Sequence, residues 1–589
     1  MKKVTVLCLE KDKNTSLPAL QDMGILHLSN IQKPDSTDLS SAVTELNNAE
    51  SALSLINKYD LPSSEKQTAD ANKIIDQILD IQTKRQKLIE NKTGLTKEEE
   101  TCSPLGNFEP DTIRQLSAKG ILVKLYTAPS KVNITAPEQT ELVPLSKDAT
   151  NQYFAIISEK EFEFDAKEIS LPKRSLSEIR NQIKNNDKCL DELENEIRTF
   201  VNAKKGIEQA IILRKEKVAL LNARDGMGLA GTIAYLQGFC PEGLVEKLQN
   251  EAATQGWGLV IEEPGEEDRI PTLIKYPAWV KPIKSVFDGL ALLPGYREAD
   301  ISMVFMIFFS IFFAMLIGDA GYGLLFLVIT ILARIKNKKA PFYPFALFGI
   351  LSIATIIWGV MTVNYFGISP EYMPQWIRSL SVGWLIDDEL GQKHLMKLCF
   401  LIGSVHLTIA HAWNAIVLFP NKKWIAQIGW IGIVWFMFYT ALNMVVGEPY
   451  PSWTFGLLIG GLLAVILFMT ERKDFKKEIV NHFMLPLSVV SCFVDIISYI
   501  RLFAVGMASA AVAQSFNNMA MGLGVSKIWT IPIIAVILLI GHGLNILLCA
   551  LGILVHGVRL NTLEFSVHKG LEWTGIKYKP FTKLSNNKV

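Results

Sequence analysis

The sequence predicts a protein in two parts: a soluble α+β domain with an antiparallel helical stalk, followed by an α-helical domain that crosses a membrane many times. The 589 residues are too many for one hydrophobic core. Residues 1–295 are rich in charge, whereas residues 296–589 consist mostly of long apolar runs. These two observations, with a regular apolar seam in the first part, define the fold class.

Five short runs in the first part are typical of β-strands: KVTVLCL (3–9), GILVKLY (120–126), YFAIIS (153–158), GTIAYLQGF (231–239) and GLVIEE (258–263). Helical patterns separate them, which predicts two small α+β lobes. The apolar run at the start ends at Glu10, too early for a signal peptide, so we expect this part to stay in the cytoplasm.

The stalk is predicted by apolar residues at heptad spacing. The seam consists of Leu176, Ile179, Ile183, Leu190, Leu193, Ile197, Phe200, Ile207 and Ile211. We expect stalk helices at about 40–98 and 175–222, with a distal lobe at about 100–172. The alternative is an ordinary pair of core helices.

Apolar runs long enough to span the bilayer predict about eight transmembrane helices. They lie near 301–318, 321–335, 343–365, 396–418, 424–446, 453–470, 485–518 and 528–560. The last two are longer than a bilayer is thick, so we expect them to tilt strongly or project from it.

Loop charge predicts the orientation. The stretches ARIKNKK (333–339), NKKW (421–424) and ERKDFKKE (471–478) are rich in lysine and arginine, and the alternate loops are poor in both. The basic loops fall on the side of the N-terminal domain, so the positive-inside rule places both termini in the cytoplasm.

Several classes of function are excluded by what the sequence does not contain. It has neither the phosphate-binding pattern G-x-x-x-x-G-K-[ST] nor a G-x-G-x-x-G after a strand. The soluble part shows no histidine metal-ligand cluster, and a net charge of +1 argues against nucleic-acid binding. We therefore expect no catalytic residue, no metal and no cofactor.

Arg501 lies within the apolar run SYIRLFAVGMASAAVAQSF (498–516). A charge at membrane depth costs about 2.5–3.5 kcal/mol on insertion scales, and Asp495 lies on another face of the helix. The small residues Ala504, Ala508, Ala511 and Ser515 flank it and allow a partner helix to approach. We expect its carboxylate partner on another chain; the alternative is a structural arginine bonded to carbonyls or water.

A polar stripe follows one face of the last apolar run. His542, Asn545, Cys549, Gly552, His556 and Arg559 are spaced 3-4-3-4-3. Such stripes line water or an ion path more often than they face lipid, so we take His542, Asn545, Cys549, His556, Ser498 and Gln514 as candidate channel-lining residues. Alternatively, Arg559 anchors to headgroups, and the histidines bond neighbouring helices.

Several long motifs, in order along the chain, resemble subunit I (the a-subunit) of the V-type and A-type rotary ATPases. They include LQDMGILHLSN (20–30), FFAMLIGDAGYGLL (312–325), SYIRLFAVGMA (498–508) and LVHGVRLNTLEF (554–565). The resemblance covers nearly the whole length. The chain is shorter than eukaryotic relatives, which favours a prokaryotic complex in the inner (plasma) membrane.

The resemblance implies a non-catalytic stator that moves H⁺ or Na⁺ while ATP is hydrolysed or made on other subunits. Its two half-channels would face a ring of c-type subunits, each with an ion-binding carboxylate, and Arg501 and Arg559 would take the roles of the family's two arginines. The soluble part would bind peripheral stalk subunits and a central stalk or collar subunit. Cys549 stands where eukaryotic relatives have a glutamate, so the pathway must use other groups there.

Two other functions fit part of the pattern. A secondary transporter would use Arg501 to bind an anionic substrate, but it predicts internal repeats that the sequence does not show. A membrane-anchored coiled-coil scaffold would explain the stalk, but it would require neither the arginine nor the polar stripe.

Overall fold

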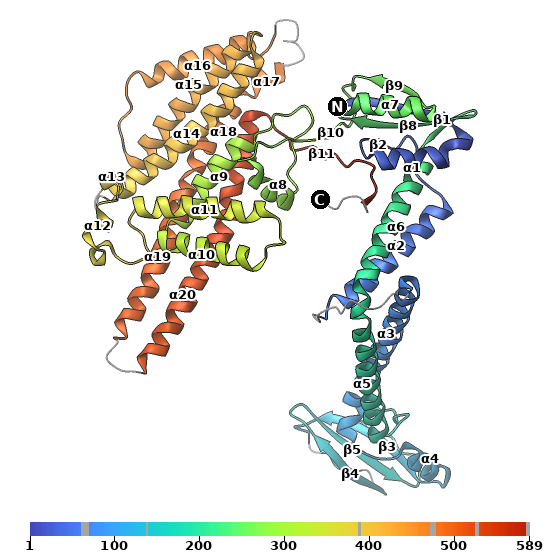
Figure 1. Cartoon of the computed structure of the whole chain (residues 1–589). Coiled ribbons are helices and arrows are strands. Elements are labelled where there is room, and N and C mark those ends of the chain that lie inside the picture. Colours follow the sequence, from blue (N-terminus) through green and yellow to red (C-terminus); the bar gives the residue numbers. More distant parts are fainter. Residues whose placement is uncertain are drawn as a thin grey trace. The chain divides into compact units, whose positions relative to one another are not determined.

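The computed structural model describes residues 1–59, 70–132, 134–136, 139–386, 390–471, 479–524 and 529–584. The chain forms two compact units (Figure 1). The first contains Met1–Pro264 and the C-terminal residues from Lys579, and the second is Gly265–Tyr578. The division therefore falls earlier than the expected boundary at 295. The segment after Pro264 belongs to the second unit, where β10 (Pro271–Thr272) pairs in parallel with β11 (Ile576–Lys577).

The first lobe is built on a sheet with strand order β2-β8-β1-β9, with β7 also paired to β8. Its strands are β1 (Lys2–Leu9), β2 (His27–Ser29), β7 (Gly228–Ala230), β8 (Ile233–Cys240) and β9 (Gly258–Glu262). Val4, Val6 and Cys8 alternate along β1 and are buried, as expected for a strand with one covered face. Helices α1 (Lys13–Met23) and α7 (Val245–Gln255) contribute Leu17, Leu20 and Leu248 to the same core.

The C-terminal residues close this lobe. Phe581 is buried in its core and donates its backbone N–H to the carbonyl of Leu26 at 2.8 Å. The backbone N–H of Lys579 donates to Nδ1 of His27 at 3.0 Å. Burial lowers the pKa of His27, which favours the neutral ring that this contact requires.

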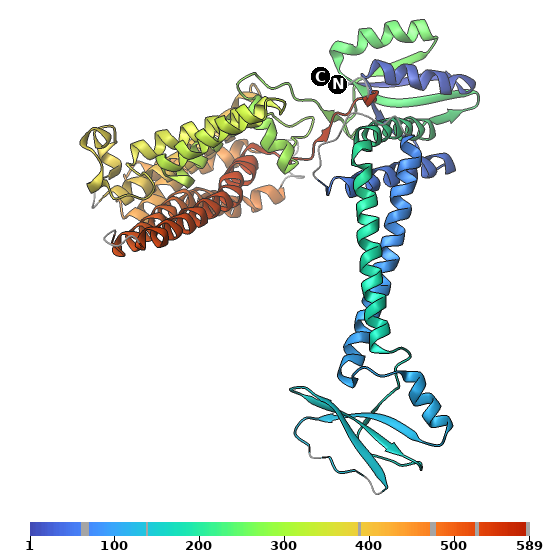
Figure 2. The same ribbon diagram turned by 60° about the horizontal axis from the view of Figure 1, so that its bottom comes forward.

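The stalk pairs two outgoing helices with two returning ones (Figure 2). Helix α2 (Thr37–Ile56) packs on α6 (Lys204–Asp225), and α3 (Ala71–Cys102) packs on α5 (Leu176–Thr199). Ile179, Ile197, Ile207 and Ile211 of the predicted seam are buried. A short 3₁₀ turn, η3 (Phe200–Ala203), interrupts the seam between α5 and α6. Residues 60–69, inside the expected first stalk helix, lie outside the described residues.

A second lobe lies where α3 ends and α5 begins. Its sheet has strand order β4-β5-β3-β6, formed by β3 (Leu122–Pro129), β4 (Thr140–Lys147), β5 (Asn151–Ser158) and β6 (Lys167–Ile169). Helix α4 (Pro110–Ala118) precedes β3. Tyr126, Phe154 and Ile156 form a buried cluster on this sheet. The two sheets therefore contain the five predicted strands, together with β2, β4, β6 and β7, which the sequence analysis did not predict.

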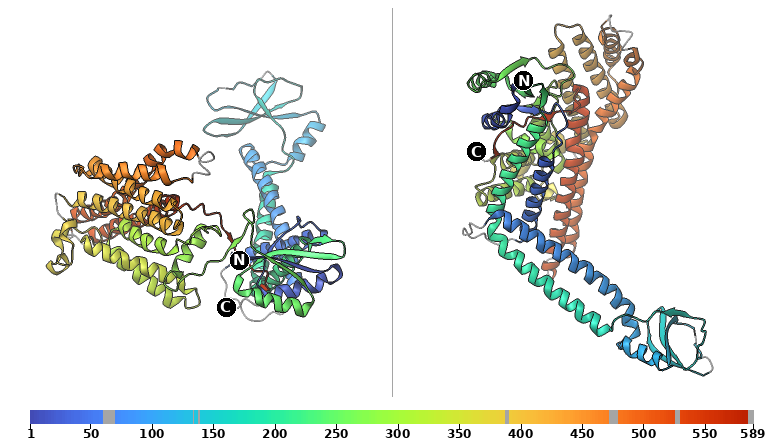
Figure 3. Two further views of the ribbon diagram at one scale, coloured as in Figure 1. Left: turned by 90° about the horizontal axis from the view of Figure 1, so that it is seen from above. Right: turned by 90° about the vertical axis from the view of Figure 1, so that its right-hand side faces the viewer.

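The second unit is a bundle of helices (Figure 3). Five helices among the described residues are long and apolar enough to cross a membrane. They are α11 (Phe342–Met361), α14 (Gly391–Leu418), α15 with its π-helical end (Lys423–Val446), α18–α19 (Leu485–Gly522) and the segment from α20 to α21 (Thr530–Lys569).

Eight separate spans are not confirmed. Helices α9 (Ser302–Ile317) and α10 (Ala320–Lys336), which the sequence predicts as two spans, meet at a bend of 120° and count together as at most a sixth span. Helix α16 (Thr454–Phe468) is shorter than a span. Both long C-terminal helices are present. The orientation argument uses loop residues 472–478 and 525–528, which lie outside the described residues.

Gly359 on α11 allows the bend between α9 and α10 to pack closely. A Cβ at this position would lie 2.7 Å from the Cα of Ala320, whereas Gly349 on the same helix has nothing within 4 Å. We expect Gly359→Ala to destabilise the second unit by about 1–3 kcal/mol, because backbone atoms cannot move aside as a side chain can. Thermal unfolding in detergent measures this. Equal melting temperatures for Gly359→Ala and Gly349→Ala would contradict it.

Candidate functional site

The site lies where the two long C-terminal helices pack side by side (Figure 1). Helix α18 (Leu485–Ser498) continues through Tyr499 into α19 (Ile500–Gly522), so Arg501 is on the first turn of α19. Its Nε donates to the carbonyl of Ser498 at 3.0 Å. Tyr499 is fully buried, and its hydroxyl is 2.9 Å from Nδ1 of His406. This buried junction fixes the backbone that carries Arg501.

Arg501 has a carboxylate partner in its own chain, which the sequence analysis did not identify. Its Nη2 lies 2.6 Å from Oε1 of Glu564. The same oxygen lies 3.4 Å from Nε of Arg559. The side chain of Glu564 is 3% exposed, those of Arg501 and Arg559 22% and 50%. One buried carboxylate therefore joins the two arginines that the sequence singled out.

Two π-helical segments bring Glu564 to this position. Helix α20 (Thr530–Gly552) continues into η8 (Ile553–Gly557) and, after Arg559, into η9 (Leu560–Phe565). In an α-helix, residues five apart point about 140° away from each other. A π-helix bonds each residue to the fifth along the chain, so its wider turn brings Arg559 and Glu564 onto the same side. The α-helical spacing used for the stripe could not reveal this contact.

The predicted polar stripe is tied into hydrogen bonds between helices. Tyr322 on α10 places its hydroxyl 2.6 Å from Nδ1 of His542 and accepts from Nδ2 of Asn545 at 3.1 Å. Cys549 lies 3.1 Å from the hydroxyl of Ser509. The alternative that the histidines bond neighbouring helices therefore describes His542. His556 is different, because its buried Nδ1 has no hydrogen-bond partner within the described residues.

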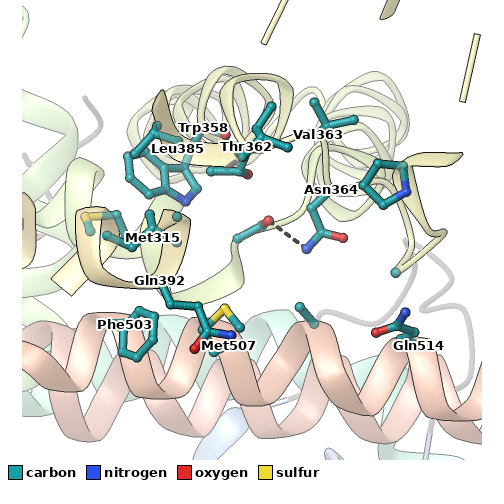
Figure 4. A pocket seen from close by; sticks show the side chains of 18 of the residues that line it. Met315, Trp358, Thr362, Val363, Asn364, Leu385, Gln392, Phe503, Met507 and Gln514 are labelled. Atoms are coloured by element: carbon teal, nitrogen blue, oxygen red, sulfur yellow. Dashed lines mark hydrogen bonds between the residues drawn. The ribbon is translucent and has the colours of Figure 1, made fainter. Parts of the chain in front are cut away.

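A cavity of about 350 Å³ opens beside α19, on a face other than the one packed against α20 (Figure 4). From α19 it is lined by Leu502, Phe503, Gly506, Met507, Ala510 and Gln514, and opposite them by Met315, Trp358, Asn364, Leu385, Gln392 and Cys399, among others. Leu502, which follows Arg501 in sequence, is among its lining residues, whereas Arg501 is not. Of the six candidate channel-lining residues, Gln514 alone lines it; the channel roles of the others stay predictions.

Asp319 positions the wall of this cavity, and the sequence analysis did not single it out. It is 1% exposed and caps α10 by accepting from the backbone N–H groups of Gly321 and Tyr322 at 2.8 and 3.1 Å. It also accepts from Phe366 and Gly367 at 2.9 and 3.1 Å. One carboxylate thus fixes the loop after α11 to the bend. An aspartate directly after an apolar run is a recognisable N-cap signal.

A second network of buried, hydrogen-bonded polar side chains lies near the group formed by Arg501, Arg559 and Glu564. Nε2 of His568 is 3.1 Å from Asp495, its Nδ1 is 2.9 Å from His411, and His411 is 2.8 Å from Gln427. These residues come from α21 (Ser566–Lys569), α18, α14 and α15, so periodicity along any one helix could not find them. Within the described residues, no group of three or more His, Cys, Asp or Glu side chains could hold a metal ion.

The fold and the site define a class: a multi-helix membrane protein with a stalked α+β domain and, between its last two long helices, two partly exposed arginines that share one buried carboxylate. The chain is 32% identical to the V-type ATP synthase subunit I of Borreliella burgdorferi, over 99% of both chains. It is 28% identical to V-type ATP synthase subunit I 1 of Treponema pallidum, again over 99% of both. The chain belongs to the subunit I family of V-type and A-type ATP synthases, as its motifs predicted.

More distant matches have lower identity. The chain is 26% identical to the A-type ATP synthase subunit I of Methanocaldococcus jannaschii, over 72% of this chain and 67% of that protein. A crystal structure of the cytoplasmic N-terminal domain of subunit I, a homolog of subunit a of V-ATPase, is 14% identical. It covers 44% of this chain and 100% of its own, with a TM-score of 0.22. No protein-family model matches the chain.

Proposed function

We propose that this protein is the stator subunit of a rotary V/A-type ATPase, which moves H⁺ or Na⁺ across the membrane while other subunits hydrolyse or make ATP. The observation that carries the proposal is Arg501, a partly exposed cation at a helix–helix junction inside an apolar bundle. Its test is ATP-driven transport by an assembled complex with Arg501→Ala. In this role the ATP sites belong to other subunits, and this chain acts as a non-catalytic subunit.

In this function Arg501 meets the carboxylates of a rotating ring of c-type subunits. A fixed cation stabilises the ionised form of a nearby carboxylate, so each ring carboxylate gives up its ion on arrival. The small face of α19 (Ala504, Ala508, Ala511, Ser515) lets a ring helix approach closely. Arginine suits the task because its guanidinium keeps its proton when buried, whereas lysine can lose its own.

The cavity beside α19 is our candidate for one of the two half-channels. It combines polar groups, among them Gln514, Asn364 and Gln392, with apolar walls, and Leu502, the neighbour of Arg501 in sequence, lines it. The loop after α11 borders it, and the positive-inside rule assigns that loop to the non-cytoplasmic side. The cavity would therefore connect that side with the ring.

Ala510→Phe should block this path, because the added ring fills space that ions or water would occupy. We expect transport to fall at least roughly tenfold, equivalent to about 1.4 kcal/mol on the rate-limiting barrier. ATP-driven ion uptake into inverted vesicles measures it. Ala510→Ser, which adds one polar atom, is the matched control and should transport normally. Unchanged transport with Ala510→Phe in an assembled complex would exclude the cavity as a path.

The first unit would connect the membrane part to the rest of the complex. A paired-helix stalk with a lobe at each end is suited to resist torque, and we propose that the lobes bind peripheral stalk subunits and a central stalk or collar subunit. Both termini would face the cytoplasm, with the second unit in the plasma membrane of a prokaryotic cell.

A further inference from the structure

Glu564 has an unusual arrangement of contacts for a buried carboxylate. Its Oε1 meets both Arg501 and Arg559, at 2.6 and 3.4 Å. Its Oε2 is buried and has no hydrogen-bond partner within the described residues. A side chain held only for structure would normally use both oxygens, since an unpaired buried oxygen is unfavourable. The contacts of Glu564 are instead concentrated on the two cations.

The cluster carries one positive charge in total, because Glu564 balances one of the two arginines. Arg501 and Arg559 remain partly exposed at 22% and 50%, while Glu564 at 3% is covered. The cations can therefore meet a carboxylate from outside the chain, and the anion stays behind them.

The ionisable groups on the surrounding elements could also set this charge. They are Asp495 and Tyr499 on α18 and its junction, His406 and His411 on α14, His556 on η8, and His568 and Lys569 on α21. Among the described residues, the ion pairs at either arginine involve Glu564 alone. Asp495 pairs instead with His568.

We propose that Glu564 is a positioning residue that sets the charge Arg501 presents to the ring: it holds the guanidinium between encounters and limits the cluster to one net positive charge. This inference rests on the proposed stator function. A ring carboxylate that arrives competes with Glu564 for Arg501, and Arg559 remains to neutralise Glu564. The exchange keeps a charge partner for each carboxylate, so the ring is not trapped by one strong ion pair.

Removing the charge of Glu564 should raise the concentration of coupling ion needed for half-maximal transport. Glu564→Gln leaves two positive charges, which favour the ionised ring carboxylate more strongly and oppose cation loading beside it. A shift of about one pKa unit corresponds to roughly a tenfold rise in that concentration. The sign is the same for H⁺ and for Na⁺, because both are cations.

The experiment uses the whole complex in inverted vesicles, with ATP-driven uptake measured against H⁺ and Na⁺ concentration. The expected result for Glu564→Gln is a roughly tenfold higher half-maximal concentration. The double variant Glu564→Gln with Arg559→Gln restores one net charge and should return it toward wild type. Glu448→Gln removes a carboxylate paired with Lys397 at 2.9 Å elsewhere in the same unit, and should leave it unchanged.

A lower rate at an unchanged half-maximal concentration would overturn the proposal, because it would mean that Glu564 only supports the fold. If Glu564→Gln does not assemble, Glu564→Asp and the double variant decide. Both keep one net charge, so the proposal expects a half-maximal concentration near that of wild type, and a roughly tenfold rise in the double variant overturns it. Arg501→Ala separates a failure of this inference from a failure of the stator function. If Arg501→Ala loses transport while Glu564→Gln shows the ion dependence of wild type, the inference about Glu564 alone is rejected. If Arg501→Ala retains transport, the stator function itself is rejected.

Discussion

Arg501→Ala should abolish ATP-driven ion transport, with a decrease of at least about a hundredfold, or roughly 2.7 kcal/mol. Without the guanidinium, nothing on α19 stabilises an ionised ring carboxylate, so each carboxylate keeps its ion as it passes. The barrier that separates the two half-channels is lost as well. Inverted vesicles that contain the complex provide the measurement, and co-purification of the other subunits reports assembly. Wild-type transport by an assembled Arg501→Ala complex would leave Arg501 a structural charge.

The ion pair with Glu564 determines the controls for this experiment. Removing one partner of a buried pair commonly costs about 3–5 kcal/mol, since the remaining charge is left uncompensated. Arg559 remains near Glu564, which limits this effect. If Arg501→Ala assembles poorly, the double variant Arg501→Ala with Glu564→Gln removes both charges and should assemble without transporting. Arg334→Ala, which removes an arginine bonded to the carbonyl of Ala340 at the end of α10, should transport normally.

The parts of the fold that follow from local periodicity were predictable. Alternation along β1 and the heptad seam ending in Ile207 and Ile211 each bury one face of one element, so the residues themselves carry the signal. The long C-terminal helices follow from hydropathy in the same way. The number of spans could not be predicted from hydropathy, because the 120° bend between α9 and α10 depends on Gly359 and on the loop after α11, both distant in sequence.

The sequence identified the two arginines of the candidate site but not the carboxylate that joins them. Arg501 is conspicuous because a charge in an apolar run is costly. Glu564 lies near the end of its segment, where a charge is unremarkable, and its approach to Arg501 depends on the π-helical turns around Arg559. Within α20, the stripe residues His542, Asn545 and Cys549 contact other helices, but the helix becomes π-helical before His556. The stripe does not show that Tyr322, from another helix, occupies the hydrogen-bonding groups of His542 and Asn545.

Asp319→Ala should prevent assembly of the complex, because four backbone N–H groups lose their acceptor at once. Each buried donor left unpaired costs about 1–3 kcal/mol, so the total is at least about 4 kcal/mol. Two of these groups begin α10 and two belong to residues 366 and 367, so the change frees the loop that borders the cavity. The yield of assembled complex and its melting temperature in detergent measure the effect.

Two variants distinguish this arrangement from ordinary helix capping. Asp300→Ala removes an exposed carboxylate that accepts from the backbone N–H of Ser302 at the start of α9, and water can replace it, so we expect a loss of about 1 kcal/mol. Asp319→Asn keeps the oxygen that accepts from Gly321, Tyr322 and Phe366 but turns an NH₂ group toward the N–H of Gly367. Its stability should therefore lie between wild type and Asp319→Ala. If Asp319→Ala melted at the same temperature as Asp300→Ala, the four buried bonds would contribute no more than a single exposed cap, and the rigid wall inferred for the cavity would have to be abandoned.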